Sequence, residues 1–356
     1  MKNVVPIVFS ISNNYVKQCA TTIISIIHNS NKNNLYEFDI LSCDLTKENI
    51  QKFMQIKNSH NNIKFNFINM NNYIESLNLD KLMSIRDGYN YISKETYFRF
   101  FIPDIFYNYD KIIYLDADLI VRNDISNLFN NDIEKYYAGA VKDAHMTRML
   151  DSKKNKTELH PNINFATYIT KFLKLKNDNY FNAGVLLLNL NKLRKDNIQN
   201  KLYEFAYQNS PLEYQDQDVL NAVLGNSIKY LEPNWNVLQG TLFPAFIKRH
   251  NEFKNAYKDA YIFHFISKNK PWIIHHAGAY KYTIEWFNFY KQTPFYNSKD
   301  DYLLEHAKYH DYIENIKNYF QLKIFNTDIL EVINDNNRIK VNLLNLIKIK
   351  TKKRKK

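Results

Sequence analysis

The sequence predicts an α/β fold: a mostly parallel, mixed sheet with helices on both faces and a helical extension at the C-terminus. Two observations support this prediction. Short apolar segments rich in β-branched residues alternate with segments whose apolar residues recur at helical spacing, which is typical of strands joined by crossover helices. In addition, no internal repeat and no Pro- or Gly-rich linker interrupts the alternation, so we expect one large domain before the extension.

Each element follows from its local pattern. Residues 4–12 are apolar and β-branched and end in a polar turn, as expected of a buried first strand. The alternation continues to residue 70, with strands expected at 36–46 and 62–70 and helices at 19–30 and 47–59.

The later part of the chain continues the alternation around one irregular region. Residues 145–179 are polar and have no clear period, so we expect an inserted loop with one short helix near 168–175. Beyond residue 283 the chain reads as helical and aromatic. The remaining elements are helices at 94–106, 191–209 and 214–225, and strands at 111–121, 136–144, 180–190 and 228–237.

The positive charge is concentrated at the C-terminal end. The net charge is +12, but residues 336–356 contain nine Lys or Arg and no acid, which leaves 39 basic against 36 acidic residues elsewhere. Because phosphate contacts spread over a binding face, we expect no nucleic-acid partner. From Ile339, apolar residues recur at Leu343 and Leu346 among lysines, which favours an amphipathic helix on an anionic membrane surface. A solvated, disordered tail is the alternative.

The rest of the composition is that of a globular protein in a reducing compartment. No apolar run is long enough to span a bilayer, and the N-terminal segment becomes polar too early for a signal peptide. Cys19 and Cys43 do not suggest a disulfide framework or a metal cage. We therefore expect a cytoplasmic protein that is peripheral on the inner face of the membrane through its tail.

Two acids interrupt an otherwise apolar segment, YLDADLIV (residues 114–121). In a strand, Asp116 and Asp118 point to the same side and Ala117 to the other. Two neighbouring carboxylates repel each other, and a divalent cation such as Mg²⁺ or Mn²⁺ removes that cost. The pattern therefore favours a metal site; a helix-capping or salt-bridged pair is the alternative.

A second segment, IIHHAGAYK (residues 273–281), could complete that site. An imidazole such as that of His275 shifts the preference from Mg²⁺ to Mn²⁺, and His276 is its rival as the ligand. Gly278 would let backbone N–H groups approach an anion, and Lys281 would supply a charge for a phosphate. A core histidine is the alternative for His275.

Two further segments combine polar groups at the ends of predicted elements. Asn182 and Gly184 begin the strand YFNAGVLLLNL, where a turn is the simpler explanation. Asp216, Gln217 and Asp218 occupy the first turn of a predicted helix, where acids also serve as caps. Such clusters of donors and acceptors suit carbohydrate hydroxyls.

Six segments in a fixed order resemble the family-8 retaining glycosyltransferases, most of all the bacterial lipopolysaccharide galactosyl- and glucosyltransferases. The resemblance covers about residues 4–281, and its segments are IVFSISNNY, TYFRF, YLDADLIV, YFNAGVLLLNL, YQDQDVLN and IHHAGAYK. It implies a GT-A fold with a Rossmann-like sheet, a UDP-galactose or UDP-glucose donor, and Mn²⁺, with Mg²⁺ as a second possibility.

The resemblance also implies roles for individual residues. The metal ligands would be Asp116, Asp118 and His275. The residues around the donor nucleotide, its diphosphate and its sugar would be Ser12, Asn14, Tyr15, Arg99, Ala117, Gly278 and Lys281. The residues near the reacting carbon and the floor of the active site would be Asp143, Asn182, Asp216 and Gln217.

The chain departs from the family pattern at two places. The first motif often carries an acid before Asn-Tyr, where this chain has Ser12 and Asn13. The last motif usually continues Lys-Pro-Trp, but here Lys281 is followed by Tyr-Thr, and a Lys-Pro-Trp lies upstream at residues 270–272. Alignment on His-x-x-Gly-x-x-Lys selects His275.

The implied organisation is a GT-A catalytic domain at 1–282, a helical extension at 283–335 and a basic membrane-associating tail at 336–356. The acceptor would be an oligosaccharide or a lipid-linked saccharide, bound by residues 145–179 and 237–271. The sequence leaves open galactose against glucose, the oligomeric state, and same-face attack against double displacement. A metal-dependent nucleotidyltransferase and a non-enzymatic, membrane-binding protein with a basic tail are the rival functions.

Overall fold

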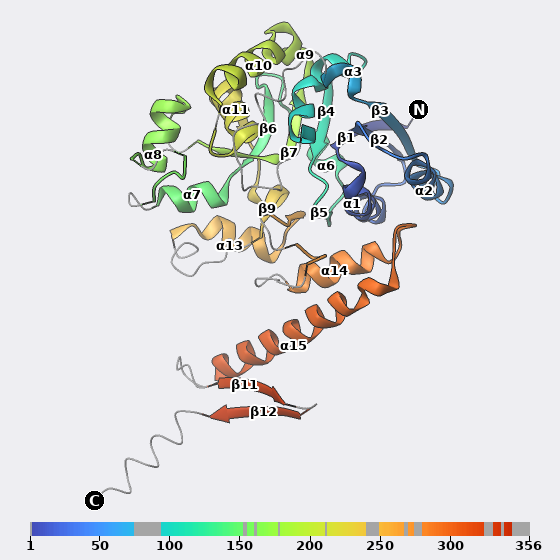
Figure 1. Cartoon of the computed structure of the whole chain (residues 1–356), viewed down its shortest axis with the longest axis vertical. Helices are drawn as coiled ribbons and strands as arrows, with labels where there is room; N and C mark the ends of the chain where they lie inside the picture. Colours follow the sequence, from blue (N-terminus) through green and yellow to red (C-terminus); the bar gives the residue numbers. More distant parts are fainter. Residues whose placement is uncertain are drawn as a thin grey trace, which may run out of the picture.

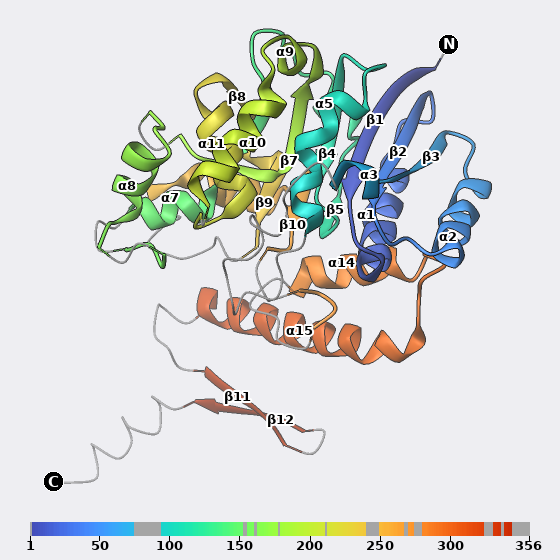
Figure 2. The ribbon, with the colours of Figure 1, turned by 45° about the horizontal axis from the view of Figure 1, so that its top comes forward.

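The computed structural model consists of an α/β body followed by C-terminal helices and a strand pair (Figures 1 and 2). It describes residues 2–74, 94–151, 155–159, 162–176, 179–210, 212–239, 249–266, 270–273, 280–323, 330–335 and 338–343.

The main sheet of the described residues has seven strands in the order β3-β2-β1-β4-β7-β6-β8. Neighbouring strands are parallel except at β7, which runs antiparallel to both β4 and β6. The predicted mixed, mostly parallel sheet is thereby confirmed. The strands are β1 (Asn3–Ser10), β2 (Asn34–Ser42), β3 (Ile63–Asn69), β4 (Lys111–Leu115), β6 (Ala138–Lys142), β7 (Phe181–Asn189) and β8 (Ile228–Tyr230).

A second sheet lies beside the carboxyl end of β4 and has the order β5-β10-β9. The strand β10 pairs antiparallel with β5 and parallel with β9. Its strands are β5 (Leu119–Val121), β9 (Val237–Leu238) and β10 (Ile262–His264).

Helices cover both faces of the main sheet (Figure 2). The helix expected at 191–209 is two helices, because Asn197 takes a left-handed conformation (φ 50°) between them. The α-helices of the body are α1 (Val16–His28), α2 (Lys47–Asn58), α3 (Asn71–Ile74), α5 (Ile102–Ile105), α6 (Ser126–Phe129), α7 (Ala144–Leu150), α8 (Phe165–Thr167), α9 (Leu190–Lys195), α10 (Ile198–Asn209), α11 (Gln215–Leu224) and α13 (Asn251–Lys258). The short 3₁₀ or π segments are η1 (Asn13–Tyr15), η2 (Lys94–Phe101), η3 (Tyr168–Phe172), η4 (Gly225–Ser227) and η5 (Pro233–Asn236).

The single strand predicted at 111–121 is wrong: the chain changes sheets in its middle. The strand β4 ends at Leu115, and β5 begins at Leu119 in the second sheet. The Thr22 hydroxyl on α1 lies 2.8 Å from both the Ala117 and the Leu119 carbonyl oxygens, which holds the crossing segment against the helix. Asp116 and Asp118 therefore lie in the crossing between two sheets, not within one strand.

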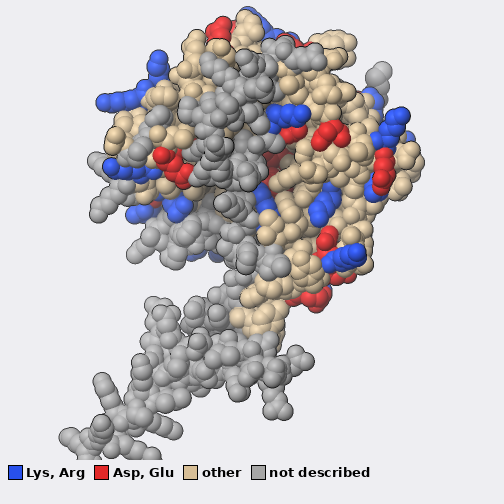
Figure 3. All heavy atoms as spheres, in the orientation of Figure 1, with Lys and Arg blue, Asp and Glu red and all other residues tan. Residues whose placement is uncertain are grey.

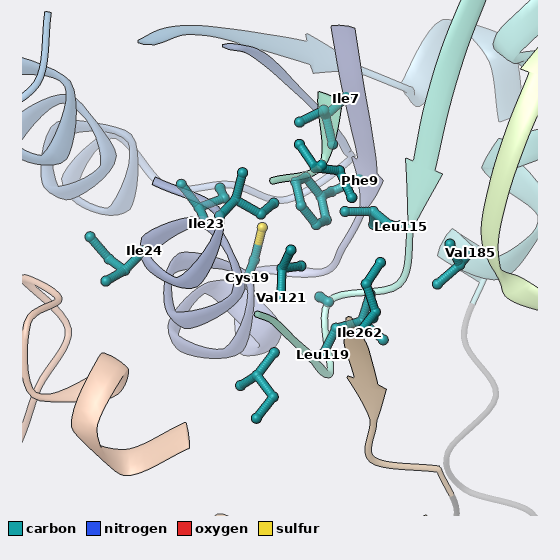
Figure 4. Close-up of a cluster of buried hydrophobic side chains, with 14 of the residues drawn as sticks. Ile7, Phe9, Cys19, Ile23, Ile24, Leu115, Leu119, Val121, Val185 and Ile262 are labelled. Carbon is teal, nitrogen blue, oxygen red and sulfur yellow. The ribbon is translucent and has the colours of Figure 1, made fainter. Parts of the chain in front are cut away.

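A cluster of buried apolar side chains packs against this crossing segment. Figure 4 shows Leu115, Leu119 and Val121 packed with Cys19 and Ile23 of α1 and with Ile262 of β10. Ala117 belongs to the same cluster. The crossing segment thus buries its apolar members in the core, while its two acids lie at the surface of that core.

The C-terminal region is helical as far as Lys323 and then differs from the prediction. The helix α14 (Tyr280–Tyr290) packs against α1, where the rings of Phe289 and His28 lie 5.6 Å apart. After η6 (Ser298–Asp300) comes α15 (Asp301–Lys323), and no helix of the described residues is long and apolar enough to cross a membrane.

The amphipathic helix predicted from Ile339 is wrong over its first residues. The strand β12 (Arg338–Leu343) pairs antiparallel with β11 (Leu330–Asp335). The apolar residues Ile339, Val341 and Leu343 alternate with polar ones, so the period of two fits a strand there. The rest of the predicted tail, residues 344–356, lies outside the described residues.

Candidate active site

Two acids and one histidine meet where the two sheets join. One ligand atom from each of Asp116, Asp118 and His264 can be chosen so that all lie within 4.8 Å of one another. The His264 Nε2 atom is 3.2 Å from Asp118 Oδ1 and 3.7 Å from Asp116 Oδ2. Because His264 ends β10 and the Phe265 N–H donates to the Asp118 carbonyl, pairing within the second sheet places the ring against the acids.

Asp118 also contacts a cation of the chain. The Lys270 ammonium lies 2.5 Å from Asp118 Oδ2, and both side chains are largely buried. Burial by itself would raise the pKa of the Asp118 carboxyl, but the charges of Lys270 and His264 outweigh it and hold that pKa well below its usual range.

Arg99 of η2 contacts Asp116 and a third acid, Asp216. Its Nη2 donates to Asp116 Oδ1 at 3.0 Å, its Nη1 donates to the Ala183 carbonyl at 2.7 Å, and its Nε lies 3.2 Å from Asp216 Oδ2. The guanidinium also lies over the Tyr114 ring, 4.3 Å from its centre. One buried arginine therefore fixes two carboxylates and the start of β7 at the same time.

Asp216 lies beside this arginine at the start of α11. Its burial raises the pKa of its carboxyl to about 7, although the charge of Arg99 opposes that rise. The nearby Asp218 has a structural role. It accepts hydrogen bonds from the hydroxyls of Tyr168 and Tyr180, which stabilises the start of α11.

Three further predicted residues form one hydrogen-bonded group. Asn182 donates to Asp143 Oδ2 at 2.9 Å, and Gln217 donates to the same oxygen at 3.3 Å. The Gln217 Oε1 atom accepts the Ala183 N–H, which ties α11 to β7. Asp143 also caps α7 through the Met146 N–H. The sequence therefore identified residues that the fold brings together.

Three of the residues predicted around the nucleotide, Ser12, Asn14 and Tyr15, lie in or next to η1. Tyr15 lies in η1, and its ring packs edge-on against Trp272 at 6.0 Å. Burial raises the pKa of the Tyr15 hydroxyl, and the charges of Asp118 and Asp116 add to that effect. Ser12 precedes η1, and the exposed Asn14 lies within it.

The predicted His275 and its rival His276 lie outside the described residues, as does Gly278. Lys281 is exposed on α14, with its ammonium 5.4 Å from the centre of the Tyr282 ring. Among the described residues, the histidine and the lysine that contact the acids are His264 and Lys270, which sequence reasoning missed.

A signal for both missed residues was present in the sequence. His264 and Lys270 are six residues apart, as are His275 and Lys281, but only Lys270 is followed by Pro-Trp. Alignment on Lys-Pro-Trp would have selected His264.

A cavity of about 570 Å³ opens beside these polar groups. Its wall includes Asp143, Asn182, Asp216 and Gln217. The rest of the lining comes largely from the region predicted as an inserted loop and is partly apolar; its residues include His145, Met146, Met149, Phe165, Tyr214 and Ile266. On the face of the body seen in Figure 3, described acidic and basic side chains are interspersed.

Comparisons with known proteins find similar glycosyltransferases. A lipopolysaccharide 1,2-glucosyltransferase of Escherichia coli is 26% identical over 89% of this chain and 86% of its own length. A lipopolysaccharide 1,3-galactosyltransferase of Salmonella typhimurium is 29% identical over 52% of this chain and 50% of its own length. The chain spans 62% of the length of a Haemophilus influenzae relative and 38% of the Streptococcus pneumoniae glycosyltransferase GlyE.

Solved structures share the fold. The bifunctional glycosyltransferase WbbM matches with a TM-score of 0.71 at 25% identity, over 86% of this chain and 52% of that one. The galactosyltransferase LgtC, solved with donor and acceptor sugar analogues, matches with a TM-score of 0.64 at 22% identity, over 84% of this chain and all of that one. The model of glycosyl transferase family 8 matches residues 6–275, and the chain belongs to that family.

Proposed function

We propose that this glycosyltransferase moves galactose or glucose from a UDP-sugar to a saccharide acceptor of lipopolysaccharide or lipooligosaccharide, with Mn²⁺ and with retention at the anomeric carbon. The observation that carries the proposal is the meeting of Asp116, Asp118 and His264 beside a cavity lined by sugar-binding types of side chain. The lipopolysaccharide glucosyl- and galactosyltransferases among its relatives support the substrate class.

The residues at the junction of the sheets fit a divalent cation. Two carboxylates and an imidazole within 4.8 Å are a suitable donor set, and the imidazole favours Mn²⁺ over Mg²⁺. A bound cation would supply Lewis-acid stabilisation for the charge that develops on a departing diphosphate. Lys270, which already contacts Asp118, would supply a second positive charge to the same phosphates.

The group around Asp143 would hold the sugar that is transferred. Asp216 and Asn182 offer acceptors and donors to hydroxyls, while Arg99 fixes the Asp216 carboxylate. The Gln217 amide is already used at both ends, by the Ala183 N–H and by Asp143, so it orients and does not attack. We therefore favour same-face attack, in which the departing phosphate takes the proton of the acceptor hydroxyl.

This mechanism makes a specific chemical prediction about Asp216. Asp216→Ala should strongly lower turnover, whether the carboxylate holds the sugar or attacks it. Incubation of the wild-type protein with donor alone, followed by intact mass spectrometry, separates the two routes. A covalent sugar adduct on Asp216 would overturn same-face attack, and its absence during active turnover supports it.

The acceptor would bind in the rest of the cavity. Its partly apolar wall, with Phe165 and Tyr214 stacked 6.2 Å apart, offers flat surfaces to the apolar face of a pyranose ring. Tyr214→Ala should then raise KM for the acceptor more than KM for the donor. An equal effect on both constants would argue against this placement.

A donor panel tests the function directly. The protein is incubated with UDP-galactose, UDP-glucose, UDP-N-acetylglucosamine and GDP-mannose, each with Mn²⁺, and nucleoside diphosphate release is measured. Release of UDP from UDP-galactose or UDP-glucose, and its absence after chelation, is the expected result. Release of pyrophosphate, or no turnover with any donor, would contradict the proposal.

We also propose that the basic C-terminal residues bind an anionic membrane, so that the enzyme is peripheral on the inner face of the cytoplasmic membrane. Basic residues near an anionic surface contribute about 1 kcal/mol each. Removal of residues after 336 should release the protein from anionic liposomes and leave transfer to a soluble acceptor unchanged. Equal binding of both forms to these liposomes would refute the role of the tail.

A further inference from the structure

One buried amide lies between the proposed cation site and the proposed sugar-binding group. Asn236, the last residue of η5, is 3% exposed. Its Oδ1 atom is 3.1 Å from His264 Nδ1, and its Nδ2 donates to Asn182 Oδ1 at 2.8 Å. The two side chains that it contacts belong to the two different halves of the site.

The orientation of this amide follows from its partner Asn182. The Nδ2 of Asn182 donates to Asp143, and its Oδ1 accepts the Gly184 N–H, so Oδ1 is the atom that Asn236 meets. An acceptor at that point requires Asn236 to present its Nδ2 there. The Asn236 Oδ1 then faces His264, and the histidine must donate from Nδ1.

This arrangement places a proton on Nδ1 of the histidine. In a neutral imidazole that carries its proton on Nδ1, the lone pair is on Nε2. That is the atom 3.2 Å from Asp118 Oδ1 and 3.7 Å from Asp116 Oδ2. A lone pair on Nε2 is the form that a cation between the three groups needs.

The fold holds Asn236 firmly in this place. Pro233 begins η5, and the neighbouring Trp235 is buried with its ring 5.0 Å from that of Tyr261. The following strand β9 is paired with β10, with Leu238 opposite His264. The amide and the imidazole therefore come from two adjacent segments whose spacing is set by strand pairing.

We propose that Asn236 is a positioning residue that selects the Nδ1–H tautomer of His264 and couples the orientation of this metal ligand to that of Asn182. The proposal rests on the proposed function, because it takes His264 as a ligand of the cation. It assigns to the Pro-Asn-Trp-Asn turn a role in metal affinity, although no side chain of that turn would touch the metal.

Two near-isosteric substitutions distinguish a role of Asn236 in orienting His264 from a role in packing alone. Asn236→Asp keeps an acceptor for the His264 Nδ1–H, whereas Asn236→Leu fills a similar volume and offers none. We expect Asn236→Leu to weaken Mn²⁺ binding, measured by electron paramagnetic resonance, by about 10- to 100-fold, the usual effect of losing the partner of a metal-bound histidine. Asn236→Asp should bind Mn²⁺ at least as tightly as the wild type but turn over more slowly, because it cannot donate to Asn182.

Asn234→Ala is the matched control on the same turn. The Asn234 side chain donates to the Asp259 carbonyl and not to the site, so its loss should leave Mn²⁺ affinity unchanged. Equal losses in Asn236→Asp and Asn236→Leu, or in Asn234→Ala, would show that the turn acts only by packing. Wild-type Mn²⁺ affinity in Asn236→Leu would overturn the proposal outright.

The tautomer can be measured without any metal. In ¹⁵N-histidine-labelled protein at mildly alkaline pH, the resonance that disappears in His264→Gln should show the proton on Nδ1, and Asn236→Leu should shift it towards the Nε2–H form. A wild-type Nε2–H tautomer would refute the proposal. If the wild-type protein bound no Mn²⁺ but showed the Nδ1–H tautomer, the proposed function would fail while the positioning of the ring by Asn236 would stand.

Discussion

Gly184 on β7 is the position where one added methyl group should damage the site most directly. A Cβ atom at this position would lie 2.3 Å from His264 Cε1 and 2.7 Å from Asp116 Oδ2. Both neighbours are held: the histidine by Asn236 and by strand pairing, and Asp116 by Arg99. Gly184→Ala must therefore displace groups that have little room to move.

The size of the displacement sets the expected effect. An ordinary contact for a Cβ atom begins at 3.4 Å, so the His264 ring would have to retreat by about 1 Å. Ligand distances in metal sites vary by only about 0.2 Å, so we expect Mn²⁺ affinity to fall by at least about 10-fold. Overpacking should also lower the free energy of unfolding by about 1–3 kcal/mol.

Gly139→Ala on the neighbouring strand β6 is the control. There an added Cβ meets only the ends of the Ile133 and Leu231 side chains at 3.3 Å, so a small adjustment suffices. The assays are urea denaturation and Mn²⁺ titration of the same preparations. If Gly184→Ala kept wild-type Mn²⁺ affinity, or if both variants lost it equally, the geometry argued for His264 and Asp116 would be wrong.

Three further predictions concern residues around the site and one buried acid of β2. Thr22→Val should lower the free energy of unfolding by about 1–2 kcal/mol and weaken Mn²⁺ binding, because it removes the hydroxyl that holds the segment with the two acids; Thr21→Val, whose hydroxyl bonds within α1, should leave Mn²⁺ binding intact. Arg99→Lys should lower kcat and Mn²⁺ affinity together, since a single ammonium cannot hold Asp116, Asp216 and the Ala183 carbonyl at once; unchanged kinetics would contradict that role. Asp39→Asn should stabilise the protein by about 1–3 kcal/mol at about pH 8 and have little effect at about pH 5, as measured by urea denaturation. Burial raises the pKa of the Asp39 carboxyl to about 7, so between about pH 4 and 7 the folded state keeps a proton that the unfolded chain releases, and stability falls as pH rises; equal effects at the two pH values would refute this assignment.

The alternation of strands and helices was predictable because buried strands and amphipathic helices have distinct periods. The crossing at Asp116–Asp118 was not, since the apolar residues on both sides continue one pattern while the strand pairing changes from the first sheet to the second. The helix predicted from Ile339 was wrong because two periods compete there. The leucines and lysines fit a helical period approximately, but a period of two fits the first residues better.

The polar groups of the site were predictable where a motif is continuous in sequence, as in Asn182, Asp216 and Gln217. His264 and Lys270 were missed because two histidine–lysine pairs share one spacing, and only the Pro-Trp that follows Lys270 distinguishes them. Asn236 had no signal of its own, because its contacts arise from the parallel pairing of β9 with β10.

We propose that His264 and the two acids form the metal site of this family-8 glycosyltransferase. Mn²⁺ titration of the wild type, His264→Ala and His275→Ala, with Asp118→Asn as the reference for a lost ligand, tests it most directly. We expect His264→Ala and Asp118→Asn to lose high-affinity binding and Mn²⁺-dependent UDP release, while His275→Ala keeps both. Retention of Mn²⁺ binding by His264→Ala, with its loss in His275→Ala, would show that His275 and not His264 is the ligand.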